Sequence, residues 1–331
     1  MARLEVRAET FPVRGQFVIS RGARTETRVV TVTLTDGAAT GWGEGVPYAH
    51  YGESETSVLE QIESIRGALE SGLGRDDLLD ALPAGAARAA VDAALWHLEA
   101  ETHEPSRAPA VPPLVVATSR TVSLGEPGVM ALQAAELASE FSTLKLKLGG
   151  EGDVDRVRAV RDAAPGVALI ADANEAWRPE DVERRAVQLA ALGVSLIEQP
   201  TAPSDDEVLN TFEHPVPFAA DEAFHTRAEI ERVQGRYEVV NLKLEKTGGL
   251  TCALDALQGA RDQGLRIMVG CMLCSSLGIA PALHLAGTAE WVDLDAPYLL
   301  DRDRAPALGL GGGSVRSNPR LWRAPIIDTL L

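Results

Sequence analysis

The sequence has few of the residues that several classes of protein require. Its 331 residues include three cysteines, too few for a disulfide scaffold, and Cys271 and Cys274 lack a second cysteine or histidine pair with which to bind zinc. Every apolar run is shorter than the roughly 18 residues of a membrane-spanning helix. The first ten residues, MARLEVRAET, lack the apolar core of a signal peptide. We therefore expect a cytoplasmic protein without disulfides.

Positive charge is also scarce. The chain carries 31 Lys and Arg against 48 Asp and Glu, a formal net charge of −17. Such a chain is repelled by phosphate backbones and anionic lipid, so neither nucleic acid nor a membrane is expected as a partner. The length and the 45% hydrophobic content suffice for a large core. These features are typical of an enzyme that acts on a small molecule, and a homo-oligomer is compatible with them.

The first part of the chain differs in pattern from the rest. It contains three strand-like segments with turn glycines, at 17–22, 27–37 and 40–45, followed by helical patterns over 54–70 and 85–101. A proline-rich segment without periodicity, EPSRAPAVPPL, then marks a domain boundary near residues 103–114. We therefore divide the chain into a domain over 1–114 and a second domain over 115–300.

Beyond the boundary, short apolar segments alternate with longer amphipathic ones. Eight short segments read as strands: TVSLG, LKLKLG, ALIADAN, SLIEQP, PFAADE, VVNLKL, RIMVGCM and WVDLDAP. Helical patterns such as VDRVRAVRDAA and PEDVERRAVQLAALG fill most of the gaps. Eight strand–helix repeats predict an α/β fold of the (β/α)8-barrel type, whose active site lies at the carboxyl ends of the strands.

Acidic side chains follow three consecutive predicted strands. Asp172, Glu198 and Asp221 end strands three, four and five, so in a barrel their carboxylates converge. Each alone could be a helix cap, but three together would repel unless a cation lay between them. Oxygen ligands without Cys or His favour Mg²⁺, one ion per subunit, with Mn²⁺ as a substitute. Polar neighbours expected to orient these ligands are Asn174, Asn241 and Glu222.

Lysines flank this predicted metal site. Lys145 and Lys147 lie on strand two and Lys243 on strand six, four strands away in a ring of eight, so Lys147 and Lys243 face each other across the barrel mouth. Two amines on opposite sides of a substrate carbon can remove a proton from one face and return one to the other. This is racemisation or epimerisation, next to a carboxylate held by the metal. Lys145 is expected to lower the pKa of Lys147.

The same residues carry a family resemblance that covers essentially the whole chain. The motifs KLKLG, DANEAW, IEQP, DEA and NLKLEKTGG, in this order, resemble the muconate-lactonizing subgroup of the enolase superfamily. The resemblance implies that Lys147 and Lys243 are the acid/base pair and that the three carboxylates bind Mg²⁺. It also implies an α+β capping domain built from residues 1–114, to which residues 301–331 return.

The substrate is predicted from strand eight. Asp293 and Asp295 lie opposite the strand of Glu198, so an elongated substrate with an anion at one end and a cation at the other, such as a dipeptide, would fit. In this part of the sequence the chain resembles the dipeptide epimerases of murein-peptide metabolism, which act on L-Ala-D/L-Glu. The resemblance is carried by the acid pair and by the segments FVISRGARTETRVV, GWGEGVPYAHYGES and GCMLCSS. The resemblance implies that the pair binds the substrate ammonium and that Arg24 meets a substrate carboxylate. Tyr51 is a further candidate contact.

Other interpretations stay open at this stage. A cycloisomerase or o-succinylbenzoate synthase of the same subgroup would use the same lysines and metal, and a non-catalytic binding protein could share the fold. Arg24 could be a solvated surface residue. Asp293 and Asp295 could pair with Arg302 or Arg304 in a structural cluster.

Overall fold

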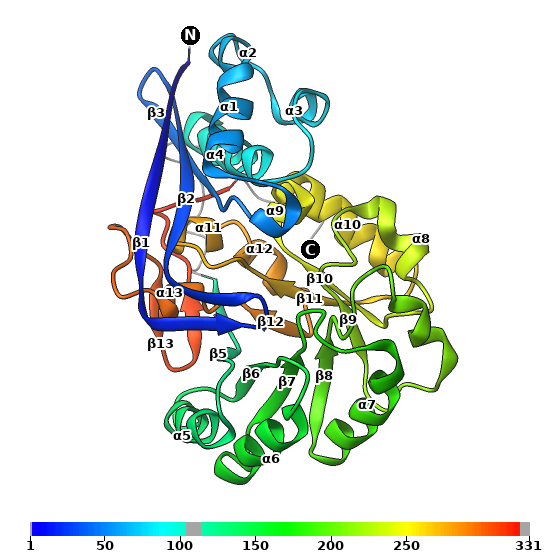
Figure 1. Ribbon diagram of the computed structural model, residues 1–331. Coiled ribbons are helices and arrows are strands. Elements are labelled where there is room, and N and C mark those ends of the chain that lie inside the picture. Colours follow the sequence, from blue (N-terminus) through cyan, green and yellow to red (C-terminus); the bar gives the residue numbers. More distant parts are fainter. Residues whose placement is uncertain (1, 104–113, 325–331) are drawn as a thin grey trace.

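The computed structural model describes residues 2–103 and 114–324, and it begins with an antiparallel sheet of three long strands (Figure 1). These are β1 (Arg3–Ile19), β2 (Gly22–Asp36) and β3 (Ala39–Gly45), in the order β1-β2-β3. The first strand starts 14 residues before the predicted start at Phe17, because Arg3 already pairs with Thr35 of β2. Charged side chains on the exposed face of β1 hide its strand pattern in the sequence.

Helices cover this sheet. They are the 3-10 helix η1 (Ala49–Tyr51), α1 (Glu55–Ser64), α2 (Arg66–Glu70), α3 (Arg75–Ala81) and α4 (Ala86–His103). The single helix predicted over 54–70 is two helices, because the backbone leaves the helical region at Ile65 (φ −107°, ψ 8°). Ser54 caps α1 by accepting from the Ser57 N–H. The alanine-rich helix α4 confirms the second predicted helix.

Strand β3 and helix α4 are in unusually close contact. Alternate residues of β3 face the helix, and three of these are glycines: Gly41, Gly43 and Gly45. A Cβ at any of them would clash with a backbone carbonyl oxygen of α4. Small side chains on the facing helix, such as Ala90 and Ala94, complete the fit. The G-x-G-x-G pattern therefore reports helix-on-sheet packing rather than a turn.

The second region is an eight-stranded parallel barrel, as predicted. Its strands are β5 (Arg120–Val122), β6 (Thr143–Lys147), β7 (Ala168–Asp172), β8 (Val194–Glu198), β9 (Phe218–Ala220), β10 (Val239–Leu242), β11 (Arg266–Gly270) and β12 (Trp291–Asp293). Each strand pairs with the next in chain order. The Ser119 N–H donates to the Val292 carbonyl at 2.8 Å, which joins the first and last strands into a ring.

The helices around the barrel are less regular than predicted. They are α5 (Pro127–Leu137), α6 (Asp153–Ala163), η2 (Pro179–Asp181), α7 (Val182–Ala191), η3 (Asp206–Thr211), η4 (Arg227–Glu229), α8 (Ile230–Val233), α9 (Leu244–Thr247), α10 (Leu250–Asp262), α11 (Ser276–Ile279), α12 (Leu283–Ala286) and α13 (Ala296–Leu299). Only a 3-10 helix links β8 to β9, so the strand–helix alternation is incomplete there.

The barrel interior is built in two layers. Its lower layer is an apolar cluster of Ile170, Leu196, Ala219, Val239 and Met268, all buried. Two residues further along β7 and β8 the side chains are Asp172 and Glu198 instead. The apolar layer closes the interior below, and the charged layer occupies the carboxyl ends of the strands.

The last described residues return to the first region. Strands β13 (Gly309–Gly311) and β14 (Ser314–Arg316) form a small sheet with β4 (Val115–Ala117), and the Trp322 indole N–H donates to the Ala93 carbonyl of α4 at 2.9 Å. The exact division at 1–114, 115–300 and 301–331 stays a prediction. Residues 104–113 of the proposed boundary lie outside the described residues.

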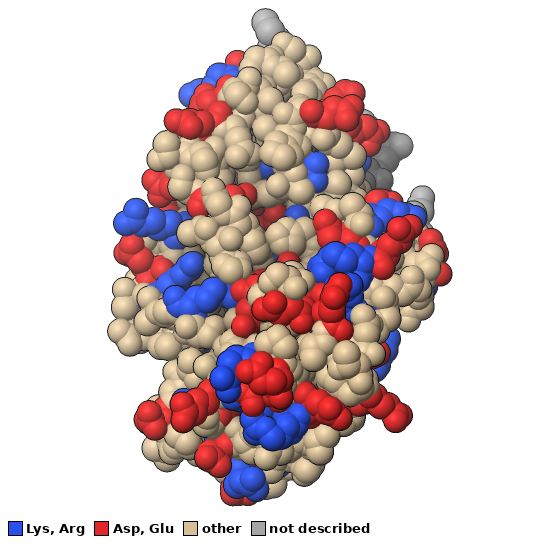
Figure 2. Space-filling view, turned by 45° about the vertical axis from the view of Figure 1, so that its right-hand side comes forward, with Lys and Arg blue, Asp and Glu red and all other residues tan. Residues whose placement is uncertain are grey.

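The surface visible in one view differs from these internal layers. On the face shown in Figure 2, acidic and basic side chains are interspersed in small clusters. None of the described helices is long and apolar enough to cross a membrane.

Candidate active site

The three predicted carboxylates lie together at the barrel mouth. Asp172 ends β7 and is in register with Glu198 at the end of β8, while Asp221 directly follows β9. Their exposed fractions are 0%, 0% and 1%, so burial removes all three from water. Three non-glycine residues among those described have a positive φ, and all follow β7 or β8: Asn174, Glu175 and Gln199. Such strain is typical of functional sites.

Lys145 is the centre of the charged layer. Its Nζ lies 2.7 Å from Glu198 Oε2, 2.7 Å from Asp293 Oδ2 and 3.2 Å from Asp172 Oδ2. Lys147, two residues on, reaches Asp172 Oδ2 at 2.6 Å. Neither lysine faces water as it would in a surface strand, since both are buried.

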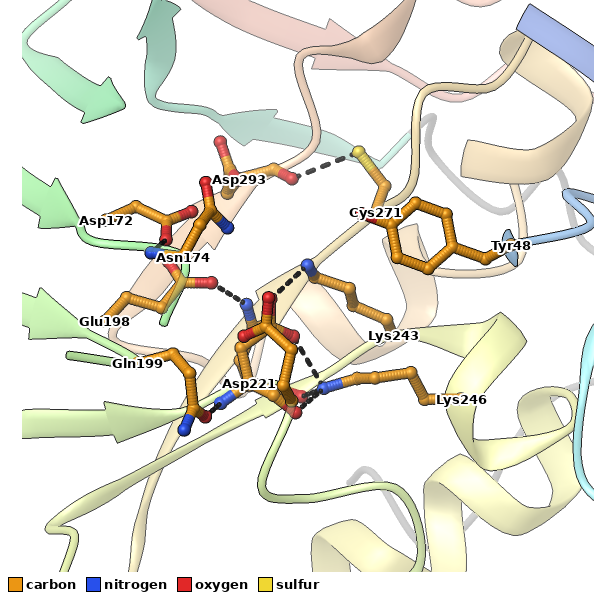
Figure 3. A network of polar contacts seen from close by, with 12 residues as sticks. Tyr48, Asp172, Asn174, Glu198, Gln199, Asp221, Lys243, Lys246, Cys271 and Asp293 are labelled. Carbon is orange, nitrogen blue, oxygen red and sulfur yellow. Dashed lines mark hydrogen bonds and ion pairs between the residues drawn. The ribbon is translucent and has the colours of Figure 1, made fainter. Parts of the chain in front are cut away.

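Lys243 lies on the other side of the mouth. Its Nζ donates to Asp221 Oδ2 at 2.6 Å, as Figure 3 shows. Lys147 and Lys243 both line one cavity between the cap and the barrel, together with Asn174, Asp221 and Glu222. The cap contributes Phe17, Ile19, Arg21, Arg24, Tyr48 and Tyr51 to the wall.

The charges in this layer shift one another's pKa values. Burial alone would lower the pKa of Lys145, but the carboxylates of Asp293, Glu198 and Asp172 hold it well above its usual value. In the same way, Asp221 outweighs burial and raises the pKa of Lys243. Burial and the neighbouring Asp172 raise the pKa of Glu198 to about 7. The expected lowering of the pKa of Lys147 stays a prediction.

The residues present fit a hard cation by their donor chemistry, although not for the reason first expected. The lysines lie among the carboxylates at ion-pair distance, so these do not need a metal ion for charge balance. Among the described residues, no three Asp, Glu, His or Cys side chains are grouped to hold a metal ion as they stand. Besides Glu198 Oε2, which forms an ion pair with Lys145, the buried oxygens of this site that accept no hydrogen bond from described residues include Asn174 Oδ1, Asn241 Oδ1 and Glu222 Oε2. Buried oxygens without donors, beside three carboxylates, suit Mg²⁺.

The predicted orienting residues hold different parts of the site. The Asn241 side chain donates to Glu198 Oε1 at 2.8 Å, which fixes that carboxylate. Asn174 receives no side-chain contact at Oδ1, but its N–H donates to Asp172 Oδ1 at 3.0 Å. Glu222 accepts from Arg21 at 2.7 Å.

Two residues at the site were not identified from the sequence. Lys246 is fully buried, and its Nζ donates to Asp221 Oδ1 at 2.7 Å and to the Asn241 carbonyl at 2.9 Å (Figure 3). Its position three residues after Lys243, about one helical turn beyond the end of β10, could have indicated that it reaches the same site. Arg21, at the tip of the β1–β2 hairpin, joins the cap to the barrel through Glu222 and through Glu175 at 3.0 Å. No local pattern indicates this long-range pairing.

The predicted substrate contacts fall into two groups. Arg24 and Tyr51 line the cavity, and the Arg24 guanidinium lies 5.3 Å from the centre of the Tyr48 ring. Asp293 and Asp295 are not among the residues that line it. Asp293 accepts from Ser119 Oγ and from Lys145, both at 2.7 Å. Asp295 pairs with Arg120 at 2.9 Å.

The acid pair has other cationic partners than the Arg302 or Arg304 of the alternative interpretation: Asp293 pairs with Lys145 and Asp295 with Arg120. Arg304 lies 2.5 Å from Glu44 Oε2 and 3.2 Å from Glu9 Oε2, so it joins the barrel to the cap sheet instead of reaching Asp293 or Asp295.

The fold and the site together define a class of protein: a capped (β/α)8-barrel with buried lysines and carboxylates at the carboxyl ends of its strands. Two family models match the chain, the mandelate racemase / muconate lactonizing enzyme N-terminal domain over residues 1–108 and the enolase C-terminal domain-like family over 129–303. The chain therefore belongs to the mandelate racemase / muconate lactonizing enzyme family of the enolase superfamily.

Individual relatives are similar over nearly the whole chain. The L-Ala-D/L-Glu epimerase of Escherichia coli K12 is 45% identical over 95% of this chain and 99% of its own length. The N-acetyl-D-glutamate racemase of a Pseudoalteromonas species is 41% identical over 83% of this chain and 89% of its own length. A crystal structure of an Agrobacterium tumefaciens enolase family member, with bound sodium and L-Ala-L-Glu, superimposes with a TM-score of 0.92 at 43% identity, covering 98% of this chain and 100% of that one.

Proposed function

We propose that this protein is a dipeptide epimerase, which inverts the α-carbon of the C-terminal residue of a dipeptide, with L-Ala-D/L-Glu as substrate. The observation that carries the proposal is the pair Lys147 and Lys243, which come from strands two and six of the barrel and line the same cavity. The relatives that epimerise L-Ala-D/L-Glu or bind L-Ala-L-Glu support the choice of substrate over a cycloisomerase or o-succinylbenzoate synthase reaction.

The lysines divide the reaction between two faces of the substrate. The neutral amine of one lysine removes the α-proton, and the ammonium group of the other delivers a proton to the opposite face. Because the negative charge of Asp221 raises the pKa of Lys243, neutralising that carboxylate would lower this pKa and increase the fraction of Lys243 that is the neutral amine able to accept a proton. Lys145 keeps its proton next to three carboxylates and serves as a fixed positive charge beside Lys147.

Asp172, Glu198 and Asp221 would hold one Mg²⁺ per subunit, or Mn²⁺ in its place. When bound, the ion supplies positive charge for the substrate carboxylate as negative charge develops during proton removal. Asn241 and Asn174 keep Glu198 and Asp172 in place for this role through their hydrogen bonds. A dipeptide epimerase of Enterococcus faecalis, solved with Mg and L-Leu-L-Tyr, is 29% identical to this chain with a TM-score of 0.85.

Arg24 and Tyr51 line the cavity and would meet the glutamate side chain of the substrate. A free guanidinium suits a carboxylate, since it can donate two parallel hydrogen bonds. The acid pair Asp293 and Asp295 would receive the dipeptide ammonium.

A second substrate class is supported by the acid pair itself. Both carboxylates already have a cation within 3 Å, Lys145 for Asp293 (2.7 Å) and Arg120 for Asp295 (2.9 Å). N-acetylglutamate, in which an acetyl group replaces the alanyl group of the dipeptide, has no ammonium group, so its binding does not require this pair. The relative that racemises N-acetyl-D-glutamate adds weight to this candidate.

Hydrogen exchange tests both candidates at once. The protein with Mg²⁺ in ²H₂O should incorporate deuterium at the α-carbon of glutamate in L-Ala-L-Glu, detected by mass spectrometry, and N-acetyl-L-glutamate should be run beside it. Exchange with neither compound, and with no member of a dipeptide library, would leave a non-catalytic binding protein as the better description.

The biological setting is part of the same proposal. An L-Ala-D/L-Glu epimerase would act on peptides released from murein, in the cytoplasm and without nucleic-acid or membrane partners, and a homo-oligomer is compatible with this role. Light scattering measures the mass of the purified protein and tests whether it is a homo-oligomer. Detection of the enzyme in the soluble fraction of the cell tests the cytoplasmic location.

A further inference from the structure

The acid pair at the end of β12 is held by partners of two different kinds. Lys145, the partner of Asp293, also contacts Glu198 and Asp172 and is therefore part of the charged layer. Arg120, the partner of Asp295, contacts no carboxylate of the proposed metal site. Arg120 also donates to the Tyr298 carbonyl at 3.2 Å, and its guanidinium lies 5.9 Å from the centre of the Tyr298 ring.

The Arg120–Asp295 pair is shielded from water. The exposed fractions of the two side chains are 11% and 4%. Asp295 Oδ2 accepts from Arg120 Nη1 at 2.9 Å and from the Thr121 N–H at 2.7 Å, so the backbone already orients this carboxylate without the arginine. Arg120 therefore adds mainly the permanent positive charge of its guanidinium group.

We infer that Arg120 is a specificity-determining residue, which sets how strongly this site prefers a dipeptide with a free N-terminal ammonium group over an N-acetylated amino acid that has none. The inference rests on the proposed function. Arg120 neutralises Asp295, so the acid pair attracts an incoming ammonium less than two free carboxylates would. The binding of an N-acetylated amino acid is not weakened by this neutralisation, and the site therefore accepts both classes of substrate.

The charge of Arg120 can be removed without touching the lysines or the metal ligands. In Arg120→Gln the Thr121 N–H still holds Asp295, and the amide replaces part of the hydrogen bonding. The measured quantity is the selectivity, the kcat/KM for L-Ala-L-Glu divided by the kcat/KM for N-acetyl-L-glutamate, from α-deuterium exchange. We expect Arg120→Gln to raise this selectivity about tenfold, equivalent to about 1.4 kcal/mol. Arg120→Lys, which keeps the charge, should stay within about twofold of the parent.

A structural role alone would lower both rates together and leave their ratio unchanged, so an unchanged or lower selectivity in Arg120→Gln overturns the inference. A second comparison remains informative where Arg120→Gln is less stable. Asp295→Asn should reduce the dipeptide kcat/KM more strongly in the Arg120→Gln background than in the parent, and equal reductions overturn the inference as well. If the parent exchanges neither substrate, the proposed function fails instead, which is a distinct result.

Discussion

The two layers of the barrel interior are made by the same strands but have different roles: the apolar layer stabilises the fold, and the charged layer carries the chemistry. The lower layer holds Ile170 of β7 and Leu196 of β8, and two residues on the same strands end in Asp172 and Glu198. Burial of the apolar pair stabilises the fold at about 25 cal/mol per Å² of apolar area. Burial of the charged pair is unfavourable for each ion alone and is offset only by its partners. Stability and chemistry are thus separated by about 7 Å along one strand, two residues of rise.

The largest effects are expected at the acid/base lysines. Lys147→Ala or Lys243→Ala should lower epimerisation by at least the 10²- to 10⁴-fold that a positioned acid or base contributes. Each variant should still exchange the α-proton of the one epimer whose hydrogen faces the remaining lysine. Nuclear magnetic resonance of both epimers in ²H₂O measures this, and full epimerase activity in either variant would refute the two-base assignment.

Metal removal acts on the same layer. EDTA should abolish turnover and Mg²⁺ should restore it, because the three carboxylates and the unpartnered oxygens are the donors that such an ion prefers. Glu198→Gln removes one of the proposed ligand charges and should weaken Mg²⁺ binding, measured by calorimetry. If this variant binds Mg²⁺ and turns over like the parent, the carboxylate cluster is structural.

The lower layer should respond in stability and not in chemistry. Leu196→Ala removes a fully buried side chain and should lower the free energy of unfolding by about 2–5 kcal/mol. The matched control is Leu132→Ala on α5, where the leucine is 71% exposed and the change should stay within about 0.5 kcal/mol. Urea denaturation gives both values. A loss of activity per folded molecule of more than tenfold in Leu196→Ala would mean that the layers are not separable.

Mild acid should destabilise the protein through two histidines that lie outside both layers. Burial lowers the pKa of His97 on α4 and of His284 on α12 to about 4, from 6.5 when unfolded. Between these values the unfolded chain binds more protons than the folded one, so stability falls as the pH decreases from 6.5 towards 4. We expect a loss of roughly 2–3 kcal/mol for each histidine.

His97 shows the physical reason, since its Nδ1 accepts from the Trp42 N–H at 3.2 Å and cannot do so once protonated. Thermal unfolding of the parent and of His97→Gln between pH 7 and pH 4 tests this prediction. A parent whose melting temperature does not change over that range would contradict it.

The smallest effect is expected at the acid pair. Asp293→Asn with Asp295→Asn keeps the size of both side chains and removes their charge, so a substrate ammonium loses charge-assisted hydrogen bonds. The kcat/KM for L-Ala-L-Glu should fall about tenfold, which corresponds to about 1.4 kcal/mol. N-acetyl-L-Ala-L-Glu, which has no ammonium, should lose little further activity. Equal losses for both peptides would assign the pair a purely structural role.

The success of sequence reasoning depended on how local the determining contacts are. The eight strands were identified because each carries its own apolar pattern, and Asp172, Glu198 and Lys147 followed from their positions at strand ends. The pairing of Arg120 with Asp295 crosses 175 positions and was not predicted, since nothing near either residue marks the contact. Arg302 and Arg304 were considered only as alternative partners of the acid pair.

Charge balance in the mouth shows a second reason for error. Three carboxylates seemed to require a metal ion as long as Lys145 was assigned only to Lys147 and Lys246 went unnoticed. Whether a buried carboxylate has an ammonium partner depends on side-chain reach inside the folded barrel, and strand periodicity does not report it. The G-x-G-x-G segment of β3 was taken for turn glycines for a similar reason, because its partner α4 is 40 or more residues away.

The contacts of Arg304 and Trp322 have a consequence for synthesis on the ribosome. The cap sheet and α4 are made first, yet Arg304 supplies the cation for the buried Glu44, and Trp322 packs against the helix near Ala93. Domains generally begin to fold as they emerge, from the N-terminus onward. Here the cap must wait, with the buried carboxylate of Glu44 lacking its arginine, until almost the whole chain has left the exit tunnel. Two residues that are made late thus hold in place residues that are made early.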